Sequence, residues 1–215
     1  MIKQSGDILY LGSQSRSRQE LLTAAGIPFC VVTHTSTERD VPYQGNSDAY
    51  VIAVAEDKMQ HLVLPALDEV AQDFLFVVTA DTMIQIVRTG ELFGKPDNYA
   101  HALAMLAAMY QEPVRVVTGT CMQKMQRGVS SWQLLAKEHY ATGALVEFDV
   151  HPHEREEYLA HLPEALYCCG AGIVEGFGFN YVKSVAGSYA AVIGLPIFEL
   201  RESLRQHGFV FPRLV

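Results

Sequence analysis

Residues 8–22 read ILYLGSQSRSRQELL, and the rest of the chain is organised around this stretch. An apolar run stops at Gly12, a cluster of serine and arginine follows, and a helix-like pattern then begins. This order predicts a strand, a tight turn at Gly12, and a helix capped by Ser13 or Ser15. The free N–H groups at such a helix start, together with Arg18, favour the oxygens of a phosphate. The alternative interpretation is a capped surface helix with solvated arginines.

Composition limits the classes of protein that this chain can be. Its 215 residues are 49% hydrophobic, enough for one sizeable core or for two small lobes that share a sheet. No apolar run is long enough to cross a bilayer, and the start MIKQSGD lacks a secretory segment, so we expect a cytoplasmic protein without a membrane partner. The net charge of −8 argues against a nucleic-acid surface. The four cysteines have the spacing of neither a disulfide framework nor a zinc site.

A continuous apolar segment, FLFVVTA, covers residues 74–80. A strand that is apolar without alternation is covered on both faces of a sheet, so we expect this one to be central. Asp81 and Thr82 follow it directly, which places a carboxylate at the mouth of the sheet, where open α/β sheets bind ligands. Asp81 therefore either caps a turn or takes part in chemistry. A short hairpin is expected next, over residues 83–93.

Two lysines and a glutamate are expected near this edge of the sheet. A helix that begins at Ser47 as its N-cap places Lys58 inside the apolar arc, where the side chain either snorkels to solvent or sets a positive charge against a phosphate. Lys95 follows the hairpin and lies beside the same edge. Glu38 comes just beyond a short strand at residues 29–33, and it is either a solvated surface residue or part of the site.

The second half of the chain is expected to add strands at residues 114–125 and 144–149. A polar hairpin region around Arg127-Gly128 separates them, where insertions would be tolerated. A short helix is expected over residues 154–161. Strands that alternate with helices predict an α/β fold, and the residues alone support no finer description.

These motifs, in this order, resemble the Maf-like nucleotide pyrophosphatases, also called septum-formation inhibitor proteins. The resemblance covers nearly the whole chain. The family's S-x-S-P-R-R-x-E-L-L pattern resembles residues 13–22, its A-D-T signature resembles residues 80–82, and its G-K-P matches residues 94–96. Its C-terminal glycine-rich segment resembles residues 170–178, and its G-L-P matches residues 194–196.

The resemblance implies a specific architecture and assembly. We expect an elongated, mixed and twisted sheet flanked by helices, in a single domain over residues 1–215 with two lobes around a central cleft. We also expect a homodimer.

The resemblance further implies hydrolysis of a nucleoside triphosphate between its α and β phosphates, which releases the monophosphate and pyrophosphate. Asp81 would be the general base, acting with Lys58, Lys95 and Glu38. Mg²⁺, or else Mn²⁺ or Co²⁺, would be held by Glu38 and Asp81. The residues expected to bind the substrate are Ser13, Ser15, Ser17, Arg18, Thr82 and Glu175.

Three positions bear on the base, namely Ser17, Thr82 and Glu175. Arg16-Ser17 stands where the family has Pro-Arg, and Thr82 agrees with the branch that acts on dTTP and UTP. Glu175 instead resembles the branch that acts on 7-methyl-GTP. An ionised carboxylate only accepts hydrogen bonds, and guanine offers N1–H and a 2-amino group side by side, so we expect 7-methyl-GTP to be preferred over dTTP. The alternatives are a pyrophosphatase for dTTP, UTP or CTP, and a non-catalytic nucleotide-binding regulator of cell division.

Overall fold

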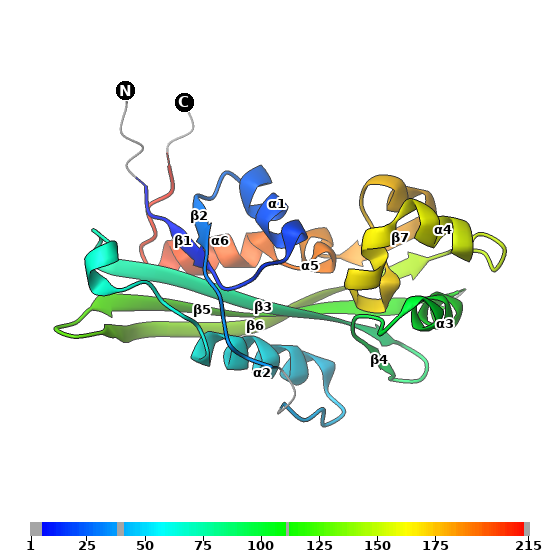
Figure 1. The fold of residues 1–215 in the computed structure, drawn as a ribbon, viewed down its shortest axis with the longest axis horizontal. Coiled ribbons are helices and arrows are strands. Elements are labelled where there is room, and N and C mark those ends of the chain that lie inside the picture. Colours follow the sequence, from blue (N-terminus) through cyan, green and yellow to red (C-terminus); the bar gives the residue numbers. More distant parts are fainter. Residues whose placement is uncertain (1–5, 38–40, 111, 213–215) are drawn as a thin grey trace.

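A mixed sheet runs along the length of the molecule and carries helices on both faces (Figure 1). The structure is a computed structural model, and it describes residues 6–37, 41–110 and 112–212. Its sheet has seven strands in the order β2-β1-β3-β5-β6-β7, with β4 paired to β3. The α/β fold with an elongated mixed sheet is therefore confirmed. The described residues contain no helix that is both long and apolar enough to cross a membrane.

The strands and helices follow one another along the chain as follows. The strands are β1 (Leu9–Leu11), β2 (Phe29–Val31), β3 (Phe74–Ile86), β4 (Leu92–Phe93), β5 (Val114–Arg127), β6 (Trp132–Phe148) and β7 (Val182–Gly187). The α-helices are α1 (Arg16–Ala24), α2 (Ser47–Gln60), α3 (Tyr99–Met109), α4 (Arg155–His161), α5 (Tyr189–Ile193) and α6 (Ile197–Gln206). Short 3₁₀ helices are η1 (Leu67–Glu69), η2 (Pro163–Tyr167), η3 (Cys169–Ala171) and η4 (Gly176–Tyr181).

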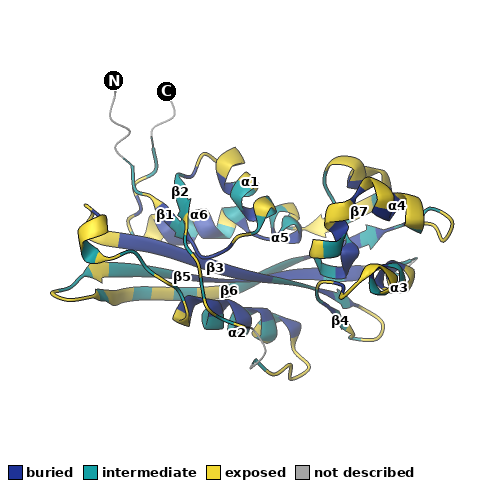
Figure 2. Ribbon diagram, viewed as in Figure 1, coloured by how far each residue is buried: buried dark blue, intermediate teal, exposed yellow. Residues whose placement is uncertain are grey.

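Strand β3 is buried on both faces, as its apolar sequence predicted (Figure 2). Successive side chains of a strand point to opposite faces. Phe76 and Val78 accordingly pack in one core cluster with residues of α1 and α6, whereas Leu75 and Val77 pack with α2 on the other face. A third cluster joins the far end of β3 to β5, β6, α3 and α4. The central strand thus links all three parts of the core.

The edge of β3 opposite β5 is covered by two different strands with a gap between them. Leu9–Leu11 of β1 pair in parallel with Phe76–Val78, and β4 pairs only with Ile84 and Gln85. Within the described residues, positions 79–83 of β3 therefore have no strand on this edge. Side chains from both faces of the sheet can reach this gap.

Two of our strand boundaries were wrong, because both ignored pairing to distant residues. Asp81 does not follow the end of a strand, since β3 continues to Ile86 and pairs with β5 over its whole length. The strand that ends near Asp81 is β1, which lies beside β3. Similarly, β6 begins at Trp132 and not at residue 144, because β5 pairs with it from Trp132 onward. Only the last residues of β6 also pair with β7, so the earlier ones lie on the sheet edge and lack an apolar run.

Helix α2 packs unusually closely against β5 because of one glycine. A Cβ atom at Gly119 would lie 2.3 Å from the backbone carbonyl carbon and oxygen of Val51, closer than real Cβ atoms come. The helix begins at Ser47, with Asn46 rather than Ser47 as its N-cap, and the side chain of Asn46 accepts from Ala49 N. The close contact fixes how far Lys58, on the same helix, extends toward the sheet.

We expect Gly119→Ala to destabilise the protein by about 1 to 3 kcal/mol, because the added methyl group must push α2 away from the sheet. Gly94→Ala is a matched control, since a Cβ there meets only the Met83 side chain, at 3.7 Å. Urea denaturation of both variants measures the difference. Equal stabilities for the two would contradict the close contact between α2 and β5.

Candidate functional site

A pocket of about 1030 Å³ opens at the gap in β3. This volume is at the upper end of the range for small-molecule sites. The structure brings together in its lining nearly all the residues predicted from the sequence: Ser13, Ser15, Ser17, Arg18, Lys58, Asp81, Thr82, Lys95 and Glu175. Glu38 lies outside the described residues. The predicted residues, which span most of the chain, therefore share one cavity.

Lys58 and Asp81, which both line the pocket, form an ion pair. Lys58 Nζ lies 2.7 Å from Asp81 Oδ1, and the two residues are only 6% and 9% exposed. The prediction that Lys58 points inward from α2 is confirmed. Burying two charges costs several kcal/mol per ion before their attraction is counted, so a buried pair is weak evidence for stability. Its location in the lining of a large pocket favours a chemical role instead.

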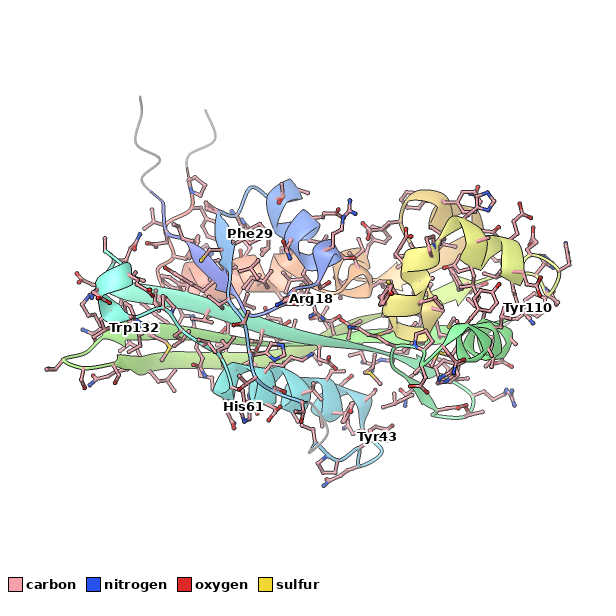
Figure 3. The ribbon with its side chains drawn as sticks, in the orientation of Figure 1. Arg18, Phe29, Tyr43, His61, Tyr110 and Trp132 are labelled. Carbon is pink, nitrogen blue, oxygen red and sulfur yellow. The ribbon has the colours of Figure 1, made fainter. Side chains whose placement is uncertain are left out.

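Arg18 reaches the same gap from the opposite face of the sheet, and Figure 3 labels it between α1 and the strands. It is 9% exposed, although arginine is rarely buried without partners. Its Nε donates to the carbonyl oxygen of Gly194 at 2.7 Å. Its two terminal nitrogens donate to Ser13 Oγ at 3.0 Å and to Thr82 Oγ1 at 3.1 Å. Arg18 therefore contacts the first loop, β3 and the turn before α6 at once.

The loop between β1 and α1 differs in detail from our expectation. Ser15 is the N-cap of α1, but its side chain makes no capping hydrogen bond. Ser13 Oγ instead accepts from Ser15 N at 3.2 Å. Gly12 is required by packing rather than by a turn, because a Cβ there would lie 2.5 Å from the Leu62 side chain and 2.7 Å from that of Thr79. Both serines of this loop line the pocket, and the Ser15 side chain makes no capping hydrogen bond to the helix.

Lys95 is placed by a contact between the hairpin and the glycine-rich segment. Gly170 N donates to the carbonyl oxygen of Gly94 at 2.9 Å. Cys169 Sγ then donates to the carbonyl oxygen of Thr82 at 2.8 Å, across the gap. Burial raises the pKa of the Cys169 thiol to about 12, so it remains a neutral donor. The spacing of the cysteines in the sequence gave no sign of this hydrogen bond to β3.

Carboxylates also line the pocket. Glu175 precedes η4 and is half-buried, and burial, followed by the negative charge of Glu20, raises its pKa above the ordinary value for glutamate. Glu164 lines the pocket as well. The pKa of the Cys168 thiol is raised by burial and then by Glu164, whereas Lys95 lowers it and Glu175 raises it. Cys168 therefore lies near one cation and two carboxylates of the pocket.

Sequence analysis missed two aromatic residues that line the pocket. Tyr167 and Phe177 line the pocket beside Glu175. Phe177 stacks on His161, with ring centroids 4.6 Å apart and an angle of 14° between the rings. The only signal in the sequence was their position next to the glycine-rich segment, which has no periodicity that would direct them toward a cavity.

The pocket residues suit a metal ion that arrives with its substrate. Among the described residues, no group of three or more His, Cys, Asp or Glu side chains could hold a metal. Mg²⁺ needs no such cage, because it keeps several waters and binds through one or two carboxylates and substrate phosphates. Asp81 Oδ2 has no hydrogen-bond partner in the part of the chain that the structure describes, since Lys58 contacts Oδ1. Asp81 thus fits one of those carboxylates.

Comparison with known proteins shows which family this chain resembles. A model of the family described as Maf-like protein matches residues 8–207. A dTTP/UTP pyrophosphatase of Acholeplasma laidlawii is 30% identical over 208 residues, which cover 96% of this chain and all of that protein. A dTTP/UTP pyrophosphatase of Anaeromyxobacter sp. is 33% identical over 205 residues, covering 95% of this chain and 91% of that protein. A dTTP/UTP pyrophosphatase of Colwellia psychrerythraea is 30% identical over 206 residues, which cover 94% of this chain and 89% of that protein.

We expect Lys58→Met and Asp81→Leu each to destabilise the protein by about 3 to 5 kcal/mol, because each removes one member of a buried ion pair. The double variant should recover much of that loss, because neither charge remains. A double-mutant cycle in urea measures the coupling between them. If the two effects simply add, the side chains do not form a buried pair.

Proposed function

This chain belongs to the Maf-like protein family, and we propose that it is a nucleoside triphosphate pyrophosphatase. It cleaves the bond between the α and β phosphates, releasing a nucleoside monophosphate and pyrophosphate. The observation that carries the proposal is the buried carboxylate of Asp81, 2.7 Å from Lys58 Nζ, in a pocket that Lys95 and Arg18 also line. A single carboxylate among several cations suits a reaction that needs one base and much stabilisation of negative charge.

Asp81 is the general base in this proposal. It accepts a proton from a water molecule lined up on the α-phosphorus, either directly or through an intervening water. Lys58 holds the carboxylate in place through Oδ1, which leaves Oδ2 for the water or for a metal. Lys95 offsets the negative charge that grows on the leaving pyrophosphate. The cations of the site therefore also compensate for the net charge of −8, which would repel the substrate.

In this proposal, the serines in the loop before α1 and in the first turn of α1 contact the polyphosphate. Ser13, Ser15 and Ser17 line the pocket at the start of a helix, where hydroxyl and backbone N–H groups can donate to phosphate oxygens. A divalent cation, Mg²⁺ by the chemistry of the donors, would be held by Asp81 and Glu38 and would neutralise part of the phosphate charge.

A homodimer, a cytoplasmic location and a single domain of two lobes belong to the same proposal.

For the base, we propose 7-methyl-GTP as the preferred substrate, read by Glu175. The supporting observation is that Glu175 lines the same pocket as Asp81 and is half-buried there. Its carboxylate can accept from N1–H and the 2-amino group of guanine. The positive charge of the 7-methylated ring favours the ionised form of Glu175, which burial otherwise disfavours. A preference for dTTP or UTP is the second candidate, favoured by Thr82 and by the activity that the names of the relatives give.

We expect Asp81→Asn to lower kcat by about 100- to 10,000-fold, because asparagine cannot accept the proton of the attacking water. Pyrophosphate release by purified protein with Mg²⁺ is the measurement, and circular dichroism checks the fold. If the folded variant turns over at the wild-type rate, Asp81 is not the base.

We expect Glu175→Gln to reduce the preference for 7-methyl-GTP over dTTP by about ten- to hundredfold. A buried acceptor that faces a thymine carbonyl costs about 1 to 3 kcal/mol, and glutamine, which also donates, removes that cost. Comparing kcat/KM for both substrates in wild type and variant gives the ratio. If the wild type prefers dTTP, or if the ratio of the two kcat/KM values is the same in the variant, Glu175 does not recognise the base.

The dependence on pH provides a control on this assignment. Because the pKa of Glu175 is raised, the protonated form persists to a higher pH than for a free glutamate. The protonated carboxyl can donate as well as accept, so the preference of the wild type for 7-methyl-GTP should shrink as the pH falls through that raised pKa. Glu175→Gln should show no such change.

A further inference from the structure

The contacts of Arg18 continue into a chain of hydrogen bonds that crosses the sheet. Thr82 Oγ1, which accepts from Arg18, also lies 2.8 Å from Thr118 Oγ1 on the neighbouring strand β5. Thr118 Oγ1 in turn lies 2.7 Å from the carbonyl oxygen of Ala191 in α5. The chain thus runs from α1 through β3 and β5 to α5, between residues far apart in sequence.

The direction of every link in this chain is fixed by the chemistry of the groups. A carbonyl oxygen only accepts, so the single proton of the Thr118 hydroxyl is donated to Ala191. Thr118 Oγ1 must then accept from Thr82, which uses the single proton of the Thr82 hydroxyl. Arg18 only donates, and it supplies the bond that Thr82 Oγ1 accepts. In this arrangement Thr82 has no proton left to donate to a nucleotide.

The chain passes beside the catalytic carboxylate, in a stretch of β3 that pairs with a neighbouring strand on one edge only. Thr82 is adjacent to Asp81, and both lie in the stretch of β3 that neither β1 nor β4 covers in the described residues. On that edge, side-chain contacts take the place of a neighbouring strand. Cys169 bonds the backbone of Thr82, and Arg18 bonds its side chain.

The other two contacts of Arg18 connect this stretch to the remaining walls of the pocket. Ser13 Oγ accepts from Arg18 and from Ser15 N, so the loop of serines is held at a set distance from β3. Gly194, whose carbonyl accepts from Arg18 Nε, has φ of +130°, a conformation that other residues rarely adopt. Arg18 therefore sets the positions of the loop, the strand and the turn before α6 relative to one another.

We propose that Arg18 and the Thr82–Thr118 hydroxyl pair form a positioning network that fixes Asp81 against the phosphate loop. This inference rests on the proposed function, since it assigns how Asp81 is held for that reaction. A geometric error of about 1 Å in a catalytic group costs on the order of 100-fold in rate, so the network acts on turnover rather than on binding.

Thr118→Val tests the network away from the pocket. Thr118 is fully buried and lies outside the pocket lining as the described residues define it, so it cannot contact the substrate. Valine keeps its shape and removes only the hydroxyl. At a temperature well below unfolding, we expect kcat for pyrophosphate release to fall about 10- to 100-fold with KM unchanged. Thr118→Ser, which keeps the hydroxyl, should stay near the wild-type kcat.

A second measurement does not depend on activity. Hydrogen exchange of the Arg18 Nε–H, followed by NMR, should be faster in Thr118→Val than in the wild type or in Thr118→Ser. An unchanged kcat, a raised KM with an unchanged kcat, or unchanged exchange each overturns the network. A wild type that releases no pyrophosphate from any triphosphate would overturn the proposed function instead, and the exchange rates would still decide whether the chain holds Arg18.

Discussion

The buried attraction between Lys58 and Asp81 is the contact on which the rest of the site depends. The two opposite charges lie 2.7 Å apart on residues that are each less than a tenth exposed, and their attraction offsets part of the cost of burying them. Gly119 allows the helix that carries Lys58 to come close enough, since any side chain there would collide with Val51. The position of Lys58 therefore depends on the close spacing between α2 and the sheet.

The gap in β3 explains how such a pair can remain accessible to a substrate. A central strand is normally covered on both edges, but β1 ends at Leu11 and β4 pairs no earlier than Ile84. Lys58 enters the gap from one face and Arg18 from the other. Side-chain hydrogen bonds, including that from Cys169, compensate for the missing neighbour on that edge. The site is thus a local interruption of an otherwise continuous sheet.

Local patterns in the sequence predicted what local physics determines, and they missed what depends on distant partners. The apolar run of β3 predicted a central strand, and the helical periodicity of α2 predicted that Lys58 lies on the inward face of that helix. Nothing local shows that β3 continues past Asp81, since that depends on β5. Arg18 binds the carbonyl of Gly194, 176 positions away, and such a contact has no short-range signal. The family resemblance supplied which residues meet, whereas the structure supplied how they are held.

In the proposed function, the nucleotide binds with its phosphates toward Lys95 and its base toward Glu175, both of which line the pocket. This orientation would present the α-phosphorus to Asp81. Hydrolysis in water enriched in oxygen-18 tests that claim most directly, because the label reports which phosphorus the water attacks. The account predicts the label in the nucleoside monophosphate and none in the pyrophosphate. Label in the pyrophosphate, or release of orthophosphate in its place, would contradict it.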